Sequence, residues 1–317
     1  MPSPATGQHG VLVAFLACAT TLPGSGERRG DAFEHDLMVA AIEPALAARG
    51  IAMRVIDWEA DLDAFEGVDL ALLGTSWNYQ DRAGAFTDRL YALSAGGIAV
   101  CNPPDMVRWN IRKTYLRELE SAGVATIPTL WRESLAGHEV EQALDLLGAD
   151  RAVVKRQIGA GAEGQVMIER ANLPPPGWDF GAPAMIQPFL PAIASEGELS
   201  FVFIDGDLSH ALVKRPQTGD YRVQSLYGGR EEVHHPSPAD RAAAQAVIDA
   251  LPFDTPLYAR IDMVRMDQGG LALMEAELIE PYLYPIQGPQ LGARLASALA
   301  RRLGGLEHEP ERSDTAG

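Results

Sequence analysis

Residues 257–278 read LYARIDMVRMDQGGLALMEAEL and predict a β-hairpin in the core of the protein. Two apolar runs, 257–265 and 271–278, have the length and composition of strands. The polar and glycine-rich residues 267–270 between them are typical of a tight connection. The rest of the fold can be worked outward from this hairpin.

Charged residues interrupt the apolar strands of the hairpin. Side chains alternate between strand faces, so Arg260 shares a face with Asp262, and Glu275 shares one with Glu277. Carboxylates on core strands are costly without a cation, and their oxygens suit hard divalent metals. The pattern favours a metal site formed by Asp262, Glu275 and Glu277, with a solvated acidic strand face as the alternative.

A lysine followed by a glycine-rich loop precedes the hairpin. Lys155 ends a predicted strand, and Gly159, Gly161 and Gly164 follow it. Glycines let backbone N–H groups approach phosphate oxygens, and a lysine adds a mobile charge. The order differs from a P-loop, where the lysine follows the glycines. Taken alone, a plain glycine-rich hairpin loop explains this stretch at least as well as a phosphate site.

The segment 185–190, MIQPFL, is an apolar strand that turns into a loop and is followed by Glu196 and Glu198. An adenine ring needs an apolar slot with polar groups at its edge, and a ribose needs a carboxylate. An ordinary strand end is the alternative.

The first hundred residues alternate between strand and helix patterns, which predicts a parallel α/β domain up to about residue 108. The loop 75–82 leaves the carboxyl end of one strand, where open α/β sheets bind ligands. It offers candidate substrate-binding side chains, namely Ser76, Trp77, Asn78, Tyr79 and Arg82. The alternative is that Trp77 and Tyr79 only pack beneath a lid.

Composition narrows the range of partners. The 317 residues carry a formal net charge of −17, which disfavours nucleic acid. Two cysteines cannot form a disulfide framework. No apolar run reaches the roughly 20 residues of a membrane span. We expect a cytoplasmic protein that binds neither nucleic acid nor membrane.

Taken in order, these motifs resemble the ATP-grasp superfamily over nearly the whole chain. Residues 186–280 are similar to prokaryotic glutathione synthetase, through QPFLPAI, VFIDGD, KRP, GDYR and GG. The tripeptide at 260–262 resembles a strand of D-alanine–D-alanine ligase. The first-domain motifs SWNYQDR, CNPP and RWNIRKTYL resemble the D-cycloserine synthetase branch, which closes O-ureido-D-serine into a ring.

The resemblance implies an α/β fold in which a parallel α/β domain precedes two subdomains of antiparallel sheets and helices. It implies boundaries at 1–108 for the first domain, 109–187 for a central lid, 188–306 for the domain with the metal site, and 307–317 for a flexible tail.

The same resemblance assigns roles to residues. ATP would contact Lys113, Lys155, Gly159, Gly161, Gln187, Phe189, Leu190 and Glu198. Two Mg²⁺ or Mn²⁺ ions would bind Asp262, Glu275 and Glu277. The catalytic cations would be Arg260, Arg222 and Lys214.

The implied activity is ATP-dependent ligation of a small amino-acid-like carboxylate to a nitrogen through an acyl phosphate. Cyclisation of an O-substituted serine is one form of it. The alternatives are an intermolecular ligase of the glutathione synthetase type and a nucleotide-binding module without catalysis. Two departures bear on this choice, because Glu277 replaces an asparagine of the relatives and Ser200 replaces an arginine of glutathione synthetase. A homodimer is left open.

Overall fold

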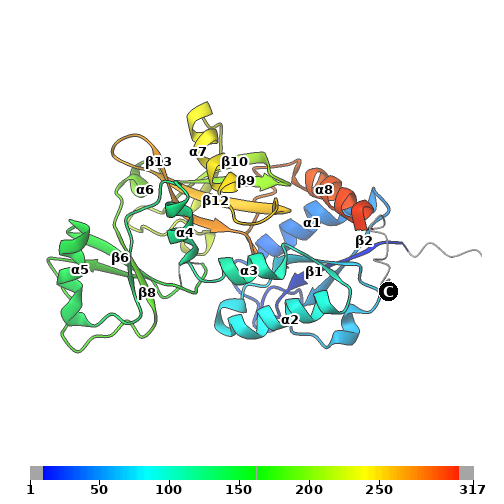
Figure 1. The fold of residues 1–317 in the computed structure, drawn as a ribbon, viewed down its shortest axis with the longest axis horizontal. Coiled ribbons are helices and arrows are strands. Elements are labelled where there is room, and N and C mark those ends of the chain that lie inside the picture. The colour runs from blue at the N-terminus through cyan, green and yellow to red at the C-terminus, as the bar shows by residue number, and fades with distance from the viewer. Residues whose placement is uncertain (1–9, 162, 307–317) are drawn as a thin grey trace, which may run out of the picture.

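The computed structural model describes residues 10–161 and 163–306 of the chain. Three β-sheets form its frame, and the chain completes each sheet before it begins the next. In Figure 1 the first sheet lies in the lobe at the right, the second in the lobe at the left, and the third in the layer between and above them.

The first sheet is parallel, with the order β2-β1-β3-β4. Since β1 leads to β2 in one direction and β3 leads to β4 in the other, right-handed crossovers place the two connecting helices on opposite faces. Figure 1 shows α1 and α2 on the two sides of the sheet. The elements are β1 (Leu12–Ala17), α1 (Phe33–Ala47), β2 (Ala52–Asp57), β3 (Leu70–Thr75), α2 (Ala83–Ala95), β4 (Ala99–Cys101) and α3 (Pro104–Asn110).

The last helix, α8 (Leu291–Leu306), returns to the first sheet and packs against α1. A Cβ atom at Gly292 would lie 1.9 Å from the backbone oxygen of Ala41, so only glycine permits this close approach. Leu295 and Leu299 are fully buried in the core of the first sheet. The sequence assigns this helix to the third domain, whereas its packing joins it to the first.

The second sheet is antiparallel, with the order β5-β8-β6-β7, and forms a lobe with its own small core. One helix, α5, packs on the sheet and buries Val140 and Leu144 against Val154 and Ile186. The elements are β5 (Leu130–Arg132), α5 (Val140–Leu147), β6 (Arg151–Arg156), β7 (Val166–Glu169) and β8 (Ala184–Pro188).

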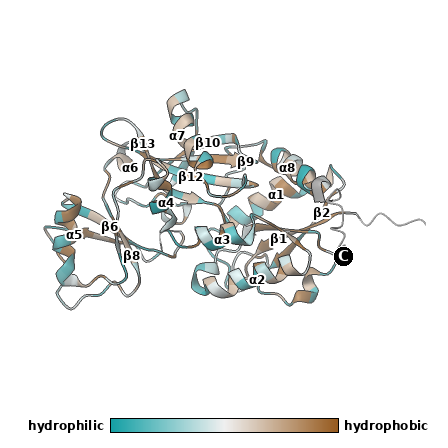
Figure 2. Ribbon diagram, viewed as in Figure 1, coloured by the Kyte–Doolittle hydropathy of each residue, from teal (hydrophilic) through white to brown (hydrophobic). Residues whose placement is uncertain are grey.

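The third sheet is also antiparallel, with the order β11-β10-β9-β12-β13. Its strand β9 is buried along its whole length because both faces are covered. Phe201 and Phe203 share a core with α4 and α7, whereas Val202 and Ile204 belong to the core of the first sheet. Figure 2 shows hydrophobic colour along β1 and β9. The elements are α4 (Tyr115–Ser121), α6 (Ala192–Ser195), β9 (Glu198–Ile204), β10 (Asp207–Arg215), β11 (Arg230–His234), α7 (Pro238–Asp249), β12 (Tyr258–Arg265) and β13 (Leu271–Glu277).

The predicted fold class is confirmed, since one parallel sheet precedes two antiparallel ones. Residues 111–114 form a turn between α3 and α4, and this turn carries Lys113. The domain boundaries stay a prediction, and the proposed tail lies outside the described residues. No helix within the described ranges is both long and apolar enough to cross a membrane.

Candidate active site

A cavity of about 450 Å³ receives side chains from all three sheets and their loops. Its size is that of a pocket for a cofactor or small molecule. It is lined by most of the side chains singled out from the sequence, which are Trp77, Lys113, Lys155, Gly159, Gly161, Gln187, Phe189, Leu190, Glu198, Lys214, Arg222, Arg260, Asp262, Glu275 and Glu277.

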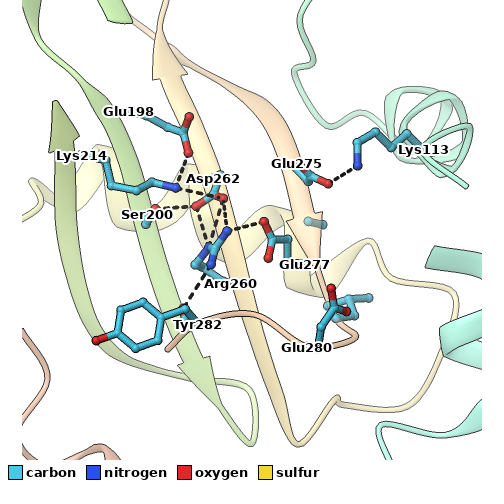
Figure 3. Close-up of polar contacts among 12 residues, drawn as sticks. Lys113, Glu198, Ser200, Lys214, Arg260, Asp262, Glu275, Glu277, Glu280 and Tyr282 are labelled. Atoms are coloured by element: carbon cyan, nitrogen blue, oxygen red, sulfur yellow. Dashed lines mark hydrogen bonds and ion pairs between the residues drawn. The ribbon is translucent and has the colours of Figure 1, made fainter. Parts of the chain in front are cut away.

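The charged residues of the hairpin face one another across its two strands. The antiparallel register pairs Arg260 with Glu277 and Asp262 with Glu275. The predicted alternation therefore brings all four side chains to the cavity side of the sheet, and Figure 3 shows them there. A register shift directly after Asp262 interrupts the ladder at this point.

Asp262 lies at the centre of a buried ion cluster. Its carboxylate accepts from the guanidinium of Arg260 at 2.9 Å and lies 3.3 Å from the ammonium of Lys214. Ser200 donates its hydroxyl to the same carboxylate. Burial would raise the pKa of Asp262, but the two cations outweigh burial and lower it to about 2.

Lys214 and Arg260 extend this cluster to two further carboxylates. Lys214 forms an ion pair with Glu198, and Arg260 forms one with Glu277. Burial acts to lower the pKa of Lys214, but Asp262 and Glu198 outweigh it and raise this pKa. Burial raises the pKa of Glu277 to about 7, although Arg260 opposes the shift. The three carboxylates of this cluster, which forms the acidic wall of the cavity, therefore outnumber its two cations.

The carboxylates of the hairpin supply some, but not all, of the ligands that a divalent cation needs. Within residues 10–161 and 163–306, no three His, Cys, Asp or Glu side chains converge closely enough to hold an ion by themselves. Mg²⁺ is usually held by one or two carboxylates together with substrate phosphates and water. Glu275 and Glu277 can supply oxygen ligands of this kind, since each is paired with a single cation, Lys113 or Arg260. Asp262 is more fully occupied, by Arg260, Lys214 and Ser200.

Two lysines and the glycine-rich loop form another side of the cavity, next to the hairpin's acidic residues. Lys113 donates to the backbone oxygen of Gly159 at 2.7 Å, and Lys155 donates to Gln187 at 3.1 Å. Lys155 forms no ion pair with any described residue, and burial lowers its pKa. Gly161 has φ +61°, a conformation that favours glycine. A triphosphate could satisfy both the lysines and the loop N–H groups.

The candidate adenine slot lies next to these lysines. Gln187 is buried and donates its amide to Thr129 at 3.0 Å, while Phe189 and Leu190 line the cavity beside it. The ring of Phe189 is held from behind by Arg151, whose guanidinium lies 4.2 Å from the ring centroid. The slot thus combines apolar surface with polar groups at its edge.

A loop from the third sheet covers part of the cavity and reaches the first domain. Arg222 pairs with Asp220 at 2.7 Å, and its guanidinium lies 3.7 Å from the ring centroid of Tyr227. Ser225 donates its hydroxyl to Glu34 at the start of α1. The loop is therefore connected to the domain expected to bind substrate.

The candidate substrate loop contributes less than the sequence suggests. Trp77 lines the cavity and donates its indole N–H to the backbone oxygen of Glu280 at 3.0 Å. Asn78 and Arg82 instead contact Glu59 away from the cavity, because this carboxylate satisfies both donors. Tyr79 is buried against Phe86, and Ser76 is fully buried. Four of the five predicted substrate residues thus do not line the cavity.

The first domain reaches the cavity through residues that the sequence did not single out, namely Arg29, Asp31, Glu34 and Gln80. Arg29 pairs with Asp31 and stacks over Trp77 at 5.1 Å. Burial raises the pKa of Glu34 to about 7. Arg29, Asp31 and Glu34 follow the end of β1, which is the same strand-end signal that pointed to the loop after β3, where Gln80 lies.

Comparison with known proteins agrees with this geometry. Residues 13–102 match the family of the D-cycloserine synthetase DcsG N-terminal domain, and residues 178–279 match the prokaryotic glutathione synthetase ATP-grasp domain. The cycloserine biosynthesis protein DcsG of Streptomyces lavendulae is 29% identical over 277 residues, covering 80% of this chain and 90% of that one.

Solved structures show the same architecture. D-cycloserine synthetase DcsG superposes with a TM-score of 0.77 at 25% identity, covering 92% of this chain and 99% of its own. D-alanine–D-alanine ligase from Bacillus anthracis shares the fold, with a TM-score of 0.65 at 17% identity, 93% of this chain and 97% of its own.

The chain has the domain composition of an ATP-grasp ligase. Its N-terminal domain is of the D-cycloserine synthetase type, and its ATP-grasp domain is of the glutathione synthetase type. The enzyme uses ATP for carbon–nitrogen ligation.

Proposed function

We propose that this enzyme phosphorylates the carboxylate of a small amino-acid-like molecule and then joins the acyl group to a nitrogen, releasing ADP and phosphate. A carboxylate is a poor electrophile, and phosphorylation gives it a good leaving group. The observation that supports this most is that the two phosphate-side lysines and the acidic hairpin face one cavity. A nucleotide-binding module without catalysis has no need of this acidic wall.

The nucleotide would occupy the space between the second and third sheets. Lys113, Lys155 and the loop at Gly159 and Gly161 would receive the phosphates. Adenine would lie against Gln187, Phe189 and Leu190, and Glu198 would accept from the ribose. In this arrangement Lys155 gains the anionic partner that it lacks among the described residues.

Asp262, Glu275 and Glu277 would hold two Mg²⁺ ions. These ions would neutralise negative charge on the terminal phosphates. Asp262 becomes available if Lys214 and Arg260 turn toward the phosphates. The protein's own cations then act on the transferring group, since Arg260, Lys214 and Arg222 all line the cavity.

The substrate would bind on the first-domain side of the cavity. Glu34 is a buried carboxylate whose described partner is the hydroxyl of Ser225, so a substrate ammonium would compensate its charge. Trp77 would shape this subsite. The similarity to cycloserine biosynthesis protein DcsG makes an O-substituted serine our first candidate.

The experiment is a screen for ADP release from Mg-ATP over D- and L-amino acids and O-ureido-D-serine, each with and without an added amine. A product made from one substrate molecule without an added amine supports cyclisation, and a product that joins two molecules supports an intermolecular ligase. AMP as the stoichiometric product would exclude the acyl phosphate route.

A further inference from the structure

One buried carboxylate on the cavity wall has no partner in the arrangement described above. Glu280 is 7% exposed and lines the cavity three residues beyond β13. No other residue within the described ranges donates to its carboxylate, and no interaction is drawn to that carboxylate in Figure 3. Its oxygens are not sealed from solvent, unlike the side-chain oxygens of Gln80 and Gln224. The carboxylate therefore faces the cavity.

Most other acidic side chains of the cavity are already paired with cations. Ion pairs connect Glu198 to Lys214, Asp262 to Lys214 and Arg260, and Glu277 to Arg260. Glu34, in contrast, accepts from a hydroxyl. Because burying an unpaired carboxylate is costly, Glu280 requires a donor that the described protein does not supply.

The backbone on which Glu280 stands is held in place from two sides. Its own carbonyl accepts from the indole of Trp77 at 3.0 Å. The carbonyl of the preceding residue, Ile279, accepts from the hydroxyl of Tyr258 at 2.6 Å. The backbone of Glu280 is thus held between the first domain and the acidic hairpin, which is the support that a group acting on a bound substrate needs.

We propose that Glu280 accepts the proton of the nitrogen that attacks the acyl phosphate. This inference rests on the proposed function. The nitrogen lone pair forms the new C–N bond while the bond between the acyl carbon and the phosphate oxygen breaks, and phosphate leaves with that electron pair. The proton of the nitrogen passes to a Glu280 carboxylate oxygen and then to solvent. No further reactant is needed.

The environment of Glu280 suits this task. Burial and the charge of Glu277 raise the pKa of Glu280 well above its usual value, and Lys113 opposes the shift. A general base works best when its pKa lies near the working pH, because a weakly basic carboxylate takes a proton poorly.

The test is Glu280→Gln, assayed with O-ureido-D-serine and Mg-ATP in the presence and absence of hydroxylamine. Hydroxylamine attacks acyl phosphates without help from a base, so hydroxamate should form at a rate within about twofold of wild type. The enzyme's own C–N product should fall by about 10²-fold or more, the usual contribution of a general base. Formate added to Glu280→Ala should restore part of the product, which a merely structural role would not allow.

Glu231→Gln is the matched control, since Glu231 is a partly buried carboxylate on β11 that does not line the cavity. It should behave as wild type in both assays. Normal C–N product from Glu280→Gln would overturn the inference, and so would parallel loss of hydroxamate and product. If wild type forms neither ADP nor hydroxamate with any amino acid of the screen, the proposed function fails and this inference fails with it.

Discussion

The ammonium of Lys113 lies 2.5 Å from a carboxylate oxygen of Glu275, although 162 residues separate them in the sequence. The same ammonium donates to the backbone of Gly159. One side chain from the turn between α3 and α4 therefore connects the glycine-rich loop to the acidic hairpin. A ligand that binds at the glycine-rich loop should therefore change the contact between Lys113 and Glu275. A ligand that binds Glu275 should likewise change the contact between Lys113 and Gly159.

Glu275→Gln should abolish turnover while leaving the fold nearly intact. The change preserves size but removes one charge from a proposed metal ligand, so turnover should fall by at least about 10²-fold at limiting Mg²⁺. ADP release and the melting temperature measure the two effects. Wild-type turnover at limiting Mg²⁺ would show that Glu275 does not bind the metal.

Lys155→Met should weaken binding of Mg-ATP by about 10- to 100-fold, since a charged hydrogen bond contributes about 1.5–3 kcal/mol. The folded protein should tolerate the change, because Lys155 forms no described ion pair and burial disfavours its charge. Calorimetric titration with a non-hydrolysable ATP analogue provides the measurement. Unchanged affinity would remove Lys155 from the phosphate site.

Asp262→Ala should lower the free energy of unfolding by about 3–5 kcal/mol, because it leaves Arg260 and Lys214 buried beside an empty position. Ser200→Ala removes only one hydroxyl donor from the same cluster and should cost about 1 kcal/mol. Urea unfolding of both variants tests the difference. Equal losses would mean that Asp262 does not organise the cluster.

The free energy of unfolding should decrease with rising pH because of Glu34. Its pKa is raised from 4.5 to about 7 in the folded protein, so the folded state binds more protons than the unfolded state between these values. Stability from Glu34 is therefore highest below pH 4.5 and falls by up to about 3 kcal/mol by pH 7.

Unfolding of wild type and Glu34→Gln should be compared at several pH values, because the difference between them isolates this residue. The difference should grow across the window and level off above pH 7. A difference that does not vary with pH would show that Glu34 titrates normally.

Trp77→Ala and Arg82→Ala should have different effects on substrate kinetics, because the two residues stand at different ends of the loop after β3. Trp77 lines the cavity, so its loss should raise the KM of the carboxylate substrate by about tenfold or more. Arg82 pairs with Glu59 away from the cavity and is largely exposed, so its loss should leave KM and kcat unchanged. An Arg82 variant with impaired substrate kinetics would show that Arg82 binds substrate, as the sequence predicts.

Much of the fold follows from local pattern. The alternation along 257–278 predicts which four side chains share the cavity face, and the register of β12 and β13 agrees. The turn that carries Lys113 has no clear signal in the sequence, because its residues are also compatible with a helix. Packing of α8 on α1 was also missed, since it depends on the contact between Gly292 and Ala41, 251 residues apart in the chain.

Sequence predicts those parts of the site in which several functional residues lie in one strand or loop. The partners of Asn78 and Arg82 were not predictable, because Glu59 lies in a different segment and only the fold brings it to them. Glu280 escaped notice for a related reason. A single glutamate beside apolar residues has no local signal until burial shows that it lacks a partner.

The proposed reaction requires ATP to activate a carboxylate by phosphorylating it. The most direct measurement uses the substrate found in the screen with ¹⁸O in its carboxylate, followed by mass analysis of the released phosphate. The account predicts that one ¹⁸O atom appears in each phosphate, together with ADP in equal amount. Phosphate without the label, or label carried into AMP, would contradict the account.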